Sequence, residues 1–385
     1  MAFFRAPSPQ SSDDVHAGDD ALGRKLGLSR RQLLAATTGI AAAMAVPALP
    51  RRADAGEQPL IRDSKRGIIL YTVRDAISRD PLTTDLPSGF REVFEALSDI
   101  GFERVEFAGY QQHANAQGGA NMETVEGAKL LRRWLNDNGL RAEGNHGFIP
   151  ASWPLTQSDI DRFKRTLEIA NILGLDHMGT GNDPTSSAYK ADWDVAAEKW
   201  NTLGEIAKAA GGTKLYTHNH DAAYNFLLDS GPLDGQGRPT RSSGIRKLEY
   251  FLTISDPRYV YLEMDIYWAH VAQYRFKTFT APDGSVQTDV FDPIAVVKPQ
   301  ERRFPLFHAK DGKLNPSNAS GYDMVPFGTG DIDYAAFFRQ LQSGHHYPMY
   351  EQDNAPGGAA DPGRSLQYAE LSYDNMSALR ASDGA

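Results

Sequence analysis

Short apolar runs alternate with longer segments of helical periodicity from residue 67 to the end of the chain. The run 67–73 (GIILYTV) is apolar and β-branched, as a strand buried on both faces is. Residues 88–100 instead repeat apolar side chains every three to four positions, as an amphipathic helix does, and Gly101 ends the repeat. The same alternation recurs along the chain, which predicts a series of strand–helix units.

The predicted strands span residues 67–73, 104–108, 141–148, 177–180, 214–218, 259–264, 305–309 and 348–351. The predicted helices span residues 88–100, 124–138, 159–173, 193–210, 245–254, 293–300, 334–343 and 365–380. Eight strands, each followed by a helix, indicate the α/β class and a single-domain (β/α)8 TIM barrel. The segments 230–244 and 276–289 are expected to be polar loops. An open doubly wound sheet is the alternative, but neither a G-x-G-x-x-G segment after an early strand nor a P-loop is present.

The first fifty-five residues have the order of an export signal. Residues 29–34 (SRRQLL) carry paired arginines, an Ala-rich apolar stretch covers 33–46, and 53–55 (ADA) fit a cleavage site. The apolar stretch is shorter than the ~20 residues that span a bilayer, although it could also be a core helix that begins with two arginines. We expect 1–55 to be a twin-arginine signal peptide with its leader, and 56–385 to be the barrel. The mature protein is then periplasmic or secreted, with no membrane association after cleavage.

Charge and cysteine content narrow the range of partners. The 385 residues have a formal net charge of −9 and no cysteine. An acidic chain lacks the basic surface that a phosphate backbone needs, so nucleic acid is not expected as a partner. Without cysteine there is no disulfide, thiolate nucleophile or cysteine-bound zinc. A small-molecule partner fits these limits, and whether the chain forms a homo-oligomer stays open.

Polar residues stand at the C-terminal ends of the predicted strands, where a parallel barrel places its active site. They are Glu106, His146, His218 with His220, Asp265, His308 with Lys310 and Asp311, and Glu351. His218 and His220 are two residues apart and share one side of their strand, so either could bind a metal while the other moves protons. Asp265 ends an apolar strand, where a carboxylate needs a partner or caps a helix. Two imidazoles and two carboxylates on the last four strands suit a divalent ion.

Several of these residues lie in segments that, in order and spacing, resemble a known family. The segments are 70–75 (LYTVRD), 218–221 (HNHD), 264–269 (MDIYWA), 308–312 (HAKDG), 328–333 (GTGDID) and the strand of Glu351. From about residue 67 onward the chain resembles bacterial sugar phosphate isomerase/epimerase-type proteins of the xylose-isomerase-like superfamily.

The resemblance implies one divalent metal, commonly manganese, magnesium, cobalt or zinc, held by strand-end Glu, Asp, His and Glu. Asp265, His308 and Glu351 match the last three positions, and His218 stands where the epimerases have the first glutamate. The family's catalytic lysine falls at Lys310. The DNA-repair branch of the fold needs additional His and Asp ligands that do not follow His308 here.

These candidates predict a metal-dependent isomerase or epimerase that removes a proton next to a carbonyl. Glu351 and His220 are the expected proton carriers, with Lys310 as a further catalytic residue. Because His218 replaces a glutamate, a lyase remains an alternative, either a dehydratase or a β-eliminase acting on a keto-sugar or 3-keto-glycoside. A barrel that binds carbohydrate without turning it over is the alternative from another class.

The expected substrate is a free sugar, keto-sugar or glycoside. Export removes the protein from the phosphorylated intermediates of the cytosol, and no phosphate-cradling glycine loop is evident. Glu106 and His146 are expected to bind its hydroxyl groups. Trp268, close to a strand end, could stack on the sugar ring or belong to the core.

Overall fold

Eight short parallel strands form the centre of the computed structural model, which describes residues 58–342 and 344–382. The predicted signal peptide and leader lie outside the described residues. The barrel strands are β1 (Gly67–Ile69), β2 (Arg104–Phe107), β3 (Arg141–Asn145), β4 (His177–Thr180), β5 (Lys214–His218), β8 (Val260–Asp265), β11 (Leu306–Ala309) and β14 (Tyr347–Tyr350). The helices are α3 (Arg74–Ile77), α4 (Gly89–Ile100), α5 (Val125–Asp137), α6 (Gln157–Leu173), α7 (Lys190–Ala209), α8 (Lys247–Ile254), α9 (Ile266–Arg275), α10 (Pro293–Val297), α11 (Tyr334–Arg339) and α12 (Arg364–Ala378).

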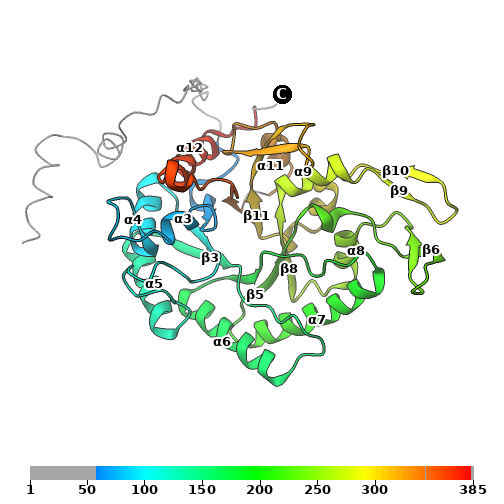
Figure 1. Ribbon diagram of the computed structural model, residues 1–385, viewed down its shortest axis with the longest axis horizontal. Helices are drawn as coiled ribbons and strands as arrows, with labels where there is room; N and C mark the ends of the chain where they lie inside the picture. Colours follow the sequence, from blue (N-terminus) through cyan, green and yellow to red (C-terminus); the bar gives the residue numbers. More distant parts are fainter. Residues whose placement is uncertain (1–57, 343, 383–385) are drawn as a thin grey trace, which may run out of the picture. The chain divides into compact units, whose positions relative to one another are not determined.

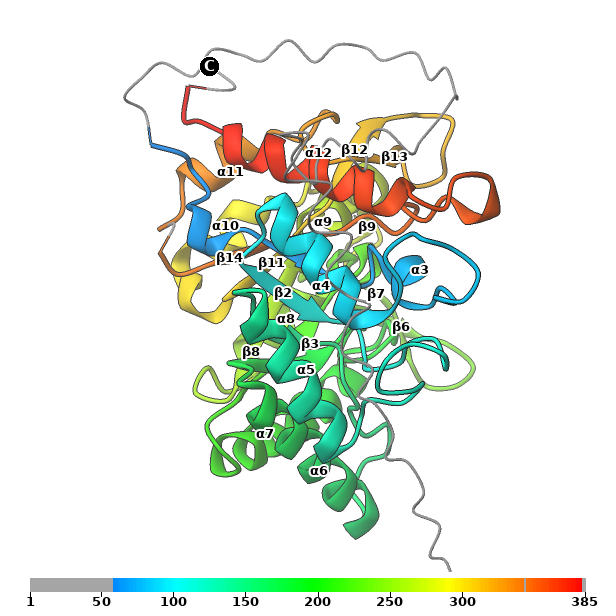
Figure 2. The same cartoon turned by 90° about the vertical axis from the view of Figure 1, so that its left-hand side faces the viewer.

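The strands follow one another around a nearly closed barrel. Their order is β3-β2-β1-β14-β11-β8-β5-β4, so β1, the first strand of the barrel, pairs with β14, the last. Between β3 and β4 a single parallel bridge joins His146 to Gly179, and the Gly147 amide donates to the Gly179 carbonyl at 2.8 Å. Helices α4 to α8 surround the strands in chain order (Figure 1), and Figure 2 shows α12, α4, α5 and α6 one after another along one side. The predicted (β/α)8 barrel is confirmed.

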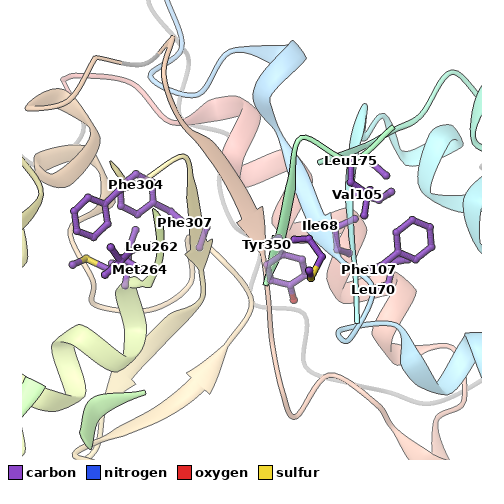
Figure 3. Close-up of a cluster of buried hydrophobic side chains, with 14 of the residues drawn as sticks. Ile68, Leu70, Val105, Phe107, Leu175, Leu262, Met264, Phe304, Phe307 and Tyr350 are labelled. Atoms are coloured by element: carbon purple, nitrogen blue, oxygen red, sulfur yellow. The ribbon is translucent and has the colours of Figure 1, made fainter. Parts of the chain in front are cut away.

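Alternate residues of the barrel strands belong to two separate cores. On the outer side, Leu262 and Met264 lie beside Phe304 and Phe307, in the large cluster that the helices cover (Figure 3). The inner apolar cluster consists of Tyr216, Leu306 and Met349, all fully buried. Two residues after each of these come His218, His308 and Glu351. The inner apolar cluster therefore lies one layer deeper in the barrel than these polar side chains.

Local signals set the helix boundaries. At the start of α6, the Thr156 hydroxyl accepts from the Asp159 amide and the Asp159 carboxylate accepts from the Thr156 amide, which is a capping box. The helix ends at Gly174, whose φ of 72° favours glycine. These two signals explain why the periodic segment forms a helix of this length.

Several predicted elements differ from the structure. The strand predicted at 67–73 ends at Ile69, because the chain turns there and enters α3. The helix predicted at 334–343 ends at Arg339, and that at 293–300 becomes α10 followed by a 3-10 segment, Lys298–Arg303. Helix α9 was not predicted, since it begins directly after β8 without a glycine or proline between them.

The segments predicted to be polar loops contain antiparallel hairpins. The hairpins pair β6 (Ser230–Leu233) with β7 (Pro239–Arg241), and β9 (Thr278–Thr280) with β10 (Val286–Thr288). A third hairpin, β12 (Asp311–Leu314) with β13 (Tyr322–Val325), follows β11. These strands are three or four residues long, too short to show alternation in the sequence. Across the described residues, no helix is both long and apolar enough to cross a membrane.

Candidate metal centre

The barrel brings together four side chains proposed from the sequence as metal ligands. His218 ends β5, Asp265 ends β8, His308 lies in β11, and Glu351 directly follows β14. The four are buried on the inner side of the barrel, at the C-terminal ends of neighbouring strands. We call this set the outer group. It joins two imidazoles and two carboxylates whose positions differ by up to 133 residues in sequence (351 − 218).

The donor atoms of the outer group face one another. Nδ1 of His308 lies 2.8 Å from Oε2 of Glu351 and 3.9 Å from Oδ2 of Asp265, and Nε2 of His218 lies 3.9 Å from the same Asp265 oxygen. Asp265 Oδ2, His308 Nδ1 and Glu351 Oε2 are fully buried, and their close contacts within the described chain are ion pairs, with one another and with Lys310. Their convergence fits a bound cation. Nitrogen and oxygen donors together suit a divalent ion such as Mn²⁺, Co²⁺ or Zn²⁺.

Lys310 supplies a positive charge at the outer group. Its Nζ lies 2.9 Å from Asp265 Oδ2, 2.7 Å from Glu351 Oε2 and 3.0 Å from Asp353 Oδ1. Burial lowers the pKa of Lys310, but these three carboxylates outweigh it and hold that pKa well above its usual value. Burial would likewise raise the pKa of Glu351, yet His308 and Lys310 outweigh it and hold that pKa well below its usual value. Glu351 is therefore a carboxylate and Lys310 an ammonium.

A second set of polar side chains lies beneath the imidazoles. We call Glu106, His146 and Glu263 the inner group. His146 Nε2 forms a 2.9 Å hydrogen bond with Glu263 Oε2, and His308 Nε2 forms one of 3.2 Å with Glu106 Oε2. Glu263 Oε2 also lies 3.5 Å from His218 Nδ1 and 3.2 Å from His308 Nε2. Burial, with Glu263 nearby, raises the pKa of Glu106 to about 7.

His218 and His308 separate the two groups. One nitrogen of each ring faces the outer group and the other faces the carboxylates of the inner group. A histidine that binds a metal through one nitrogen commonly donates its other N–H to a carboxylate. For His308 the arrangement therefore fits metal ligation on the outer side and hydrogen bonding on the inner side, whereas Nδ1 of His218 has no hydrogen bond within the described chain.

His220 and Trp268 lie beside the outer group and are only partly buried. The ring of His220 lies 5.1 Å from that of His218 and 5.4 Å from that of Trp268, centroid to centroid. Lys310 Nζ is 5.5 Å from the Trp268 ring. Burial lowers the pKa of His220, which leaves its imidazole neutral at neutral pH. These side chains therefore surround the outer group with a neutral base, an aromatic face and a cation.

The residues predicted to bind substrate hydroxyls, Glu106 and His146, both belong to the inner group. Glu106 is fully buried, and its carboxylate contacts His308 and accepts a hydrogen bond from Tyr216. Because it lies beneath the imidazoles, its position does not fit a residue that binds substrate hydroxyls. His146 keeps a partly exposed ring, but its Nε2 is directed to Glu263. Asp265 also caps α9, since its Oδ1 accepts from the Trp268 amide at 2.9 Å.

Sequence reasoning missed Glu263, Tyr216 and Asp353. Glu263 and Tyr216 each stand two residues before a predicted ligand, so period-two alternation could have placed them on the same inner face. Asp353 lies beyond the last strand and reaches Lys310 only in the folded barrel. The alternation was available in the sequence, whereas the contact of Asp353 was not.

Two of the segments that carry the resemblance support each other. The Asp311 carboxylate accepts from the amides of Gly312, Gly328 and Gly330 at 2.7, 2.9 and 3.0 Å. The Tyr334 hydroxyl donates to the Lys310 carbonyl at 2.6 Å. The 328–333 loop is thus tied to the segment that carries Lys310, and Asp311 has a structural rather than a chemical part in the site.

Solved structures share this fold at low sequence identity. A sugar phosphate isomerase/epimerase from Parabacteroides distasonis is 22% identical, with a TM-score of 0.56 over 86% of this chain and 96% of that one. A probable 3-DHS dehydratase from Bacillus anthracis is 13% identical, with a TM-score of 0.52 over 80% and 97%. D-psicose 3-epimerase from Clostridium cellulolyticum is 14% identical, with a TM-score of 0.51 over 82% and 99%. At these identities the likeness is one of fold.

The family is identified at the level of sequence. No curated protein matches the chain. Residues 94–360, which include every member of the outer and inner groups, match the family described as xylose isomerase-like TIM barrel. The protein therefore belongs to the xylose isomerase-like TIM barrel family.

Proposed function

We propose that the protein is a divalent-metal-dependent isomerase or epimerase that removes a proton next to a carbonyl of a free sugar, keto-sugar or glycoside. The outer group carries this proposal, because buried nitrogen and oxygen donors from Asp265, His308 and Glu351 converge there closely enough to hold one ion. They do so at the end of the barrel where enzymes of this fold place their active sites. The family match, and the likeness to solved structures named as isomerases and epimerases, support the same reading.

His218, Asp265, His308 and Glu351 would hold the ion, which when bound supplies Lewis-acid stabilisation of negative charge on neighbouring substrate oxygens. Glu351 is the proposed base, since its carboxylate is ionised and lies in the outer group. His220 is the proposed second proton carrier, because its ring adjoins both His218 and Trp268.

Two further side chains would bind the substrate. The ammonium of Lys310 can donate to a substrate oxygen. Trp268 offers an aromatic face, and its indole N–H is buried without a hydrogen-bond partner in the described chain. A sugar ring could stack on this aromatic face.

A lyase is the second candidate. The proposed proton carriers differ in kind, one a carboxylate and the other an imidazole, and Lys310 Nζ lies 2.7 Å from Glu351 Oε2. A proton donor so close to the base can protonate a leaving oxygen, which favours a dehydratase or β-eliminase acting on a keto-sugar or 3-keto-glycoside.

We also propose that the protein acts outside the cytoplasm on unphosphorylated substrates. The support is the paired arginines, apolar stretch and small-residue site of residues 29–55. Replacing both Arg30 and Arg31 by lysine should keep the precursor in the cytoplasm, as fractionation would show. Normal export of that variant would contradict this part of the proposal.

The reaction can be tested in deuterated water. Chain produced without its first 55 residues is loaded with Mn²⁺, Co²⁺, Mg²⁺ or Zn²⁺ and incubated with aldoses, ketoses and 3-keto-glycosides. Proton NMR should show metal-dependent loss of the hydrogen on the carbon next to the carbonyl. Retained carbon skeletons with deuterium indicate isomerisation or epimerisation, and an unsaturated product indicates a lyase.

Glu351→Gln should abolish exchange, whereas Glu103→Gln, an exposed carboxylate before β2, should leave it unchanged. The proposal fails if metal-loaded chain neither exchanges nor eliminates with any of the three substrate classes. It also fails if chelator leaves the rate unaltered.

A further inference from the structure

The two nitrogens of His308 have different surroundings. Nδ1 faces the outer group, 2.8 Å from Oε2 of Glu351 and 3.9 Å from Oδ2 of Asp265. Nε2 forms a 3.2 Å hydrogen bond with Oε2 of Glu106. A neutral imidazole carries one proton, and the nitrogen that holds it cannot bind a metal. Whichever group fixes that proton therefore decides whether His308 can serve the outer group.

Glu106 is held on both of its oxygens. The Tyr216 hydroxyl donates to Oε1 from the inner apolar cluster, while Oε2 meets His308. The space around the carboxylate is filled, since a Cβ at Gly144 would lie 3.2 Å from both Glu106 Oε1 and the Tyr216 hydroxyl. Glu106 and Tyr216 are both 0% exposed, so Glu106 cannot turn toward solvent or substrate.

We propose that Tyr216 and Glu106 are positioning residues that keep the proton of His308 on Nε2, so that Nδ1 is the free donor for the metal. This inference rests on the metal centre of the proposed function. Glu106 acts by accepting the hydrogen bond of Nε2–H, and Tyr216 acts by fixing Glu106. Glu263 lies at a similar distance from Nε2, but its hydrogen bond goes to His146.

The alternative is a second ion in the inner part of the barrel, because His146, His218, Glu263 and His308 also offer close donor atoms. Two observations favour the positioning role. The inner contacts of His146 and His308 are hydrogen bonds to carboxylates, although His218 Nδ1 and Glu263 Oε1 have none within the described chain. An ion on Nε2 would also displace the hydrogen bond to Glu106.

The test uses Co²⁺ as the probe and the visible absorption of bound cobalt as the readout, which reports ligand geometry independently of turnover. Glu106→Gln keeps the side-chain shape but replaces the carboxyl group by an amide, and should raise the dissociation constant roughly 10–100-fold. Tyr216→Phe leaves Glu106 in place and should raise the Co²⁺ dissociation constant roughly 2–10-fold, which corresponds to the loss of one hydrogen bond. Both variants should shift the cobalt spectrum.

Glu143→Gln is the matched control. Glu143 is a buried acid on β3, paired with Arg104 at 2.9 Å, and burial raises its pKa to about 7, as it does for Glu106. It should leave cobalt affinity and spectrum unchanged. Circular dichroism of each variant confirms folding, and Tyr216→Phe carries the test if Glu106→Gln is unstable.

The outcomes separate the inference from the function. Wild-type chain that binds one Co²⁺ tightly, with Glu106→Gln and Tyr216→Phe behaving like wild type, overturns the inference alone. Equal weakening by Glu106→Gln and Glu143→Gln also overturns it, since the effect is then general. If the wild-type chain binds two Co²⁺ and Glu263→Gln loses one of them, Nε2 of His308 binds an inner ion, and the inference is overturned. Wild-type chain that binds no Co²⁺ overturns both the metal centre and the inference.

Discussion

At the scale of single residues, neighbours on one strand take opposite parts. On β8, Leu262 and Met264 join the outer core, while Glu263 and Asp265 face the inside of the barrel. On β5, the same alternation places Tyr216 and His218 on the inner side of the barrel and Thr217 on the other side. Buried carboxylates are costly unless they are paired. Glu263 and Glu106 accordingly each have an imidazole beside them, and Asp265 has the ammonium of Lys310. The chemistry proposed for the site depends on this pairing.

We expect His218 and His220 to have separable roles. His218→Ala should lose metal and activity together, because Nε2 of His218 faces the outer group. His220→Ala should keep the metal but lower turnover by roughly 10²–10⁴-fold, the usual range for a general acid or base. Metal analysis and exchange rates measure the two effects. His345→Ala, an exposed histidine before β14, is the control. An empty site in His220→Ala with a filled one in His218→Ala would reverse the roles.

A buried histidine away from the centre should limit stability in acid. The pKa of His177 is lowered to about 4, because burial and then Lys214 disfavour its charged form. The unfolded chain takes up the proton first, so stability is full above the ordinary pKa of 6.5 and is lost as pH falls toward about 4.

His177→Asn tests this effect and can keep the 3.1 Å hydrogen bond to the Glu143 carbonyl. Between pH 8 and pH 5, wild type should lose roughly 2 kcal/mol more than this variant. Urea unfolding at the two pH values measures the difference. Equal losses in both proteins would mean that His177 is not the group that titrates.

At the scale of elements, polar caps and tied loops hold the site in place. Asp265 caps α9 with one oxygen and faces Lys310 with the other, so the start of the helix also orients the candidate ligand. Asp311 gathers three glycine amides and fixes the loop beside Lys310. A single carboxylate therefore links local structure to the site in each case.

The capping box of α6 should have a measurable value. Thr156→Ala removes the hydroxyl that accepts from the Asp159 amide, which should cost about 1 kcal/mol of stability. Ser158→Ala, an exposed residue in the same turn, should change stability by less than ~0.5 kcal/mol. Urea unfolding gives both values, and hydrogen exchange should rise at the first turn of α6 in Thr156→Ala alone. Equal losses of stability in the two variants would mean that the Thr156 cap does not stabilise α6.

At the scale of the whole molecule, the outer group connects distant parts of the chain. Its four members come from β5, β8, β11 and the end of β14, and β14 in turn pairs with β1. The barrel is nearly closed, with one bridge between β3 and β4. An ion held by four strands should therefore stabilise the folded state against the unfolded one, which lacks the site.

Metal should raise the melting temperature. At a concentration 100-fold above the dissociation constant, binding contributes about 2.7 kcal/mol. For a domain of this size that corresponds to a rise of about 4 °C. Asp265→Asn keeps the oxygen that caps α9 and should lose most of the rise. Calorimetry with and without chelator measures both proteins, and an equal rise in the variant would exclude Asp265 as a ligand.

Much of the fold was predictable because its signals are local. The strands at 177–180 and 214–218 were confirmed to the residue, and each begins shortly after a glycine, Gly174 or Gly212, that follows a periodic helical segment. The strand at 67–73 was predicted too long, because its apolar pattern continues after the chain has turned. Helix α9 was missed, because a strand that passes directly into a helix leaves no break.

The sequence by itself determined the strand–helix alternation and which strand ends carry His218, Asp265, His308 and Glu351, because both depend on residues close together in the chain. Only the tertiary structure decided that Glu106 lies beneath His308, 202 positions away, rather than at the open end of the barrel. It also decided that Lys310 lies between Asp265 and Glu351. The physical reason is register: how far each strand is displaced along its neighbour sets the depth of its inward residues, and no local pattern records that displacement.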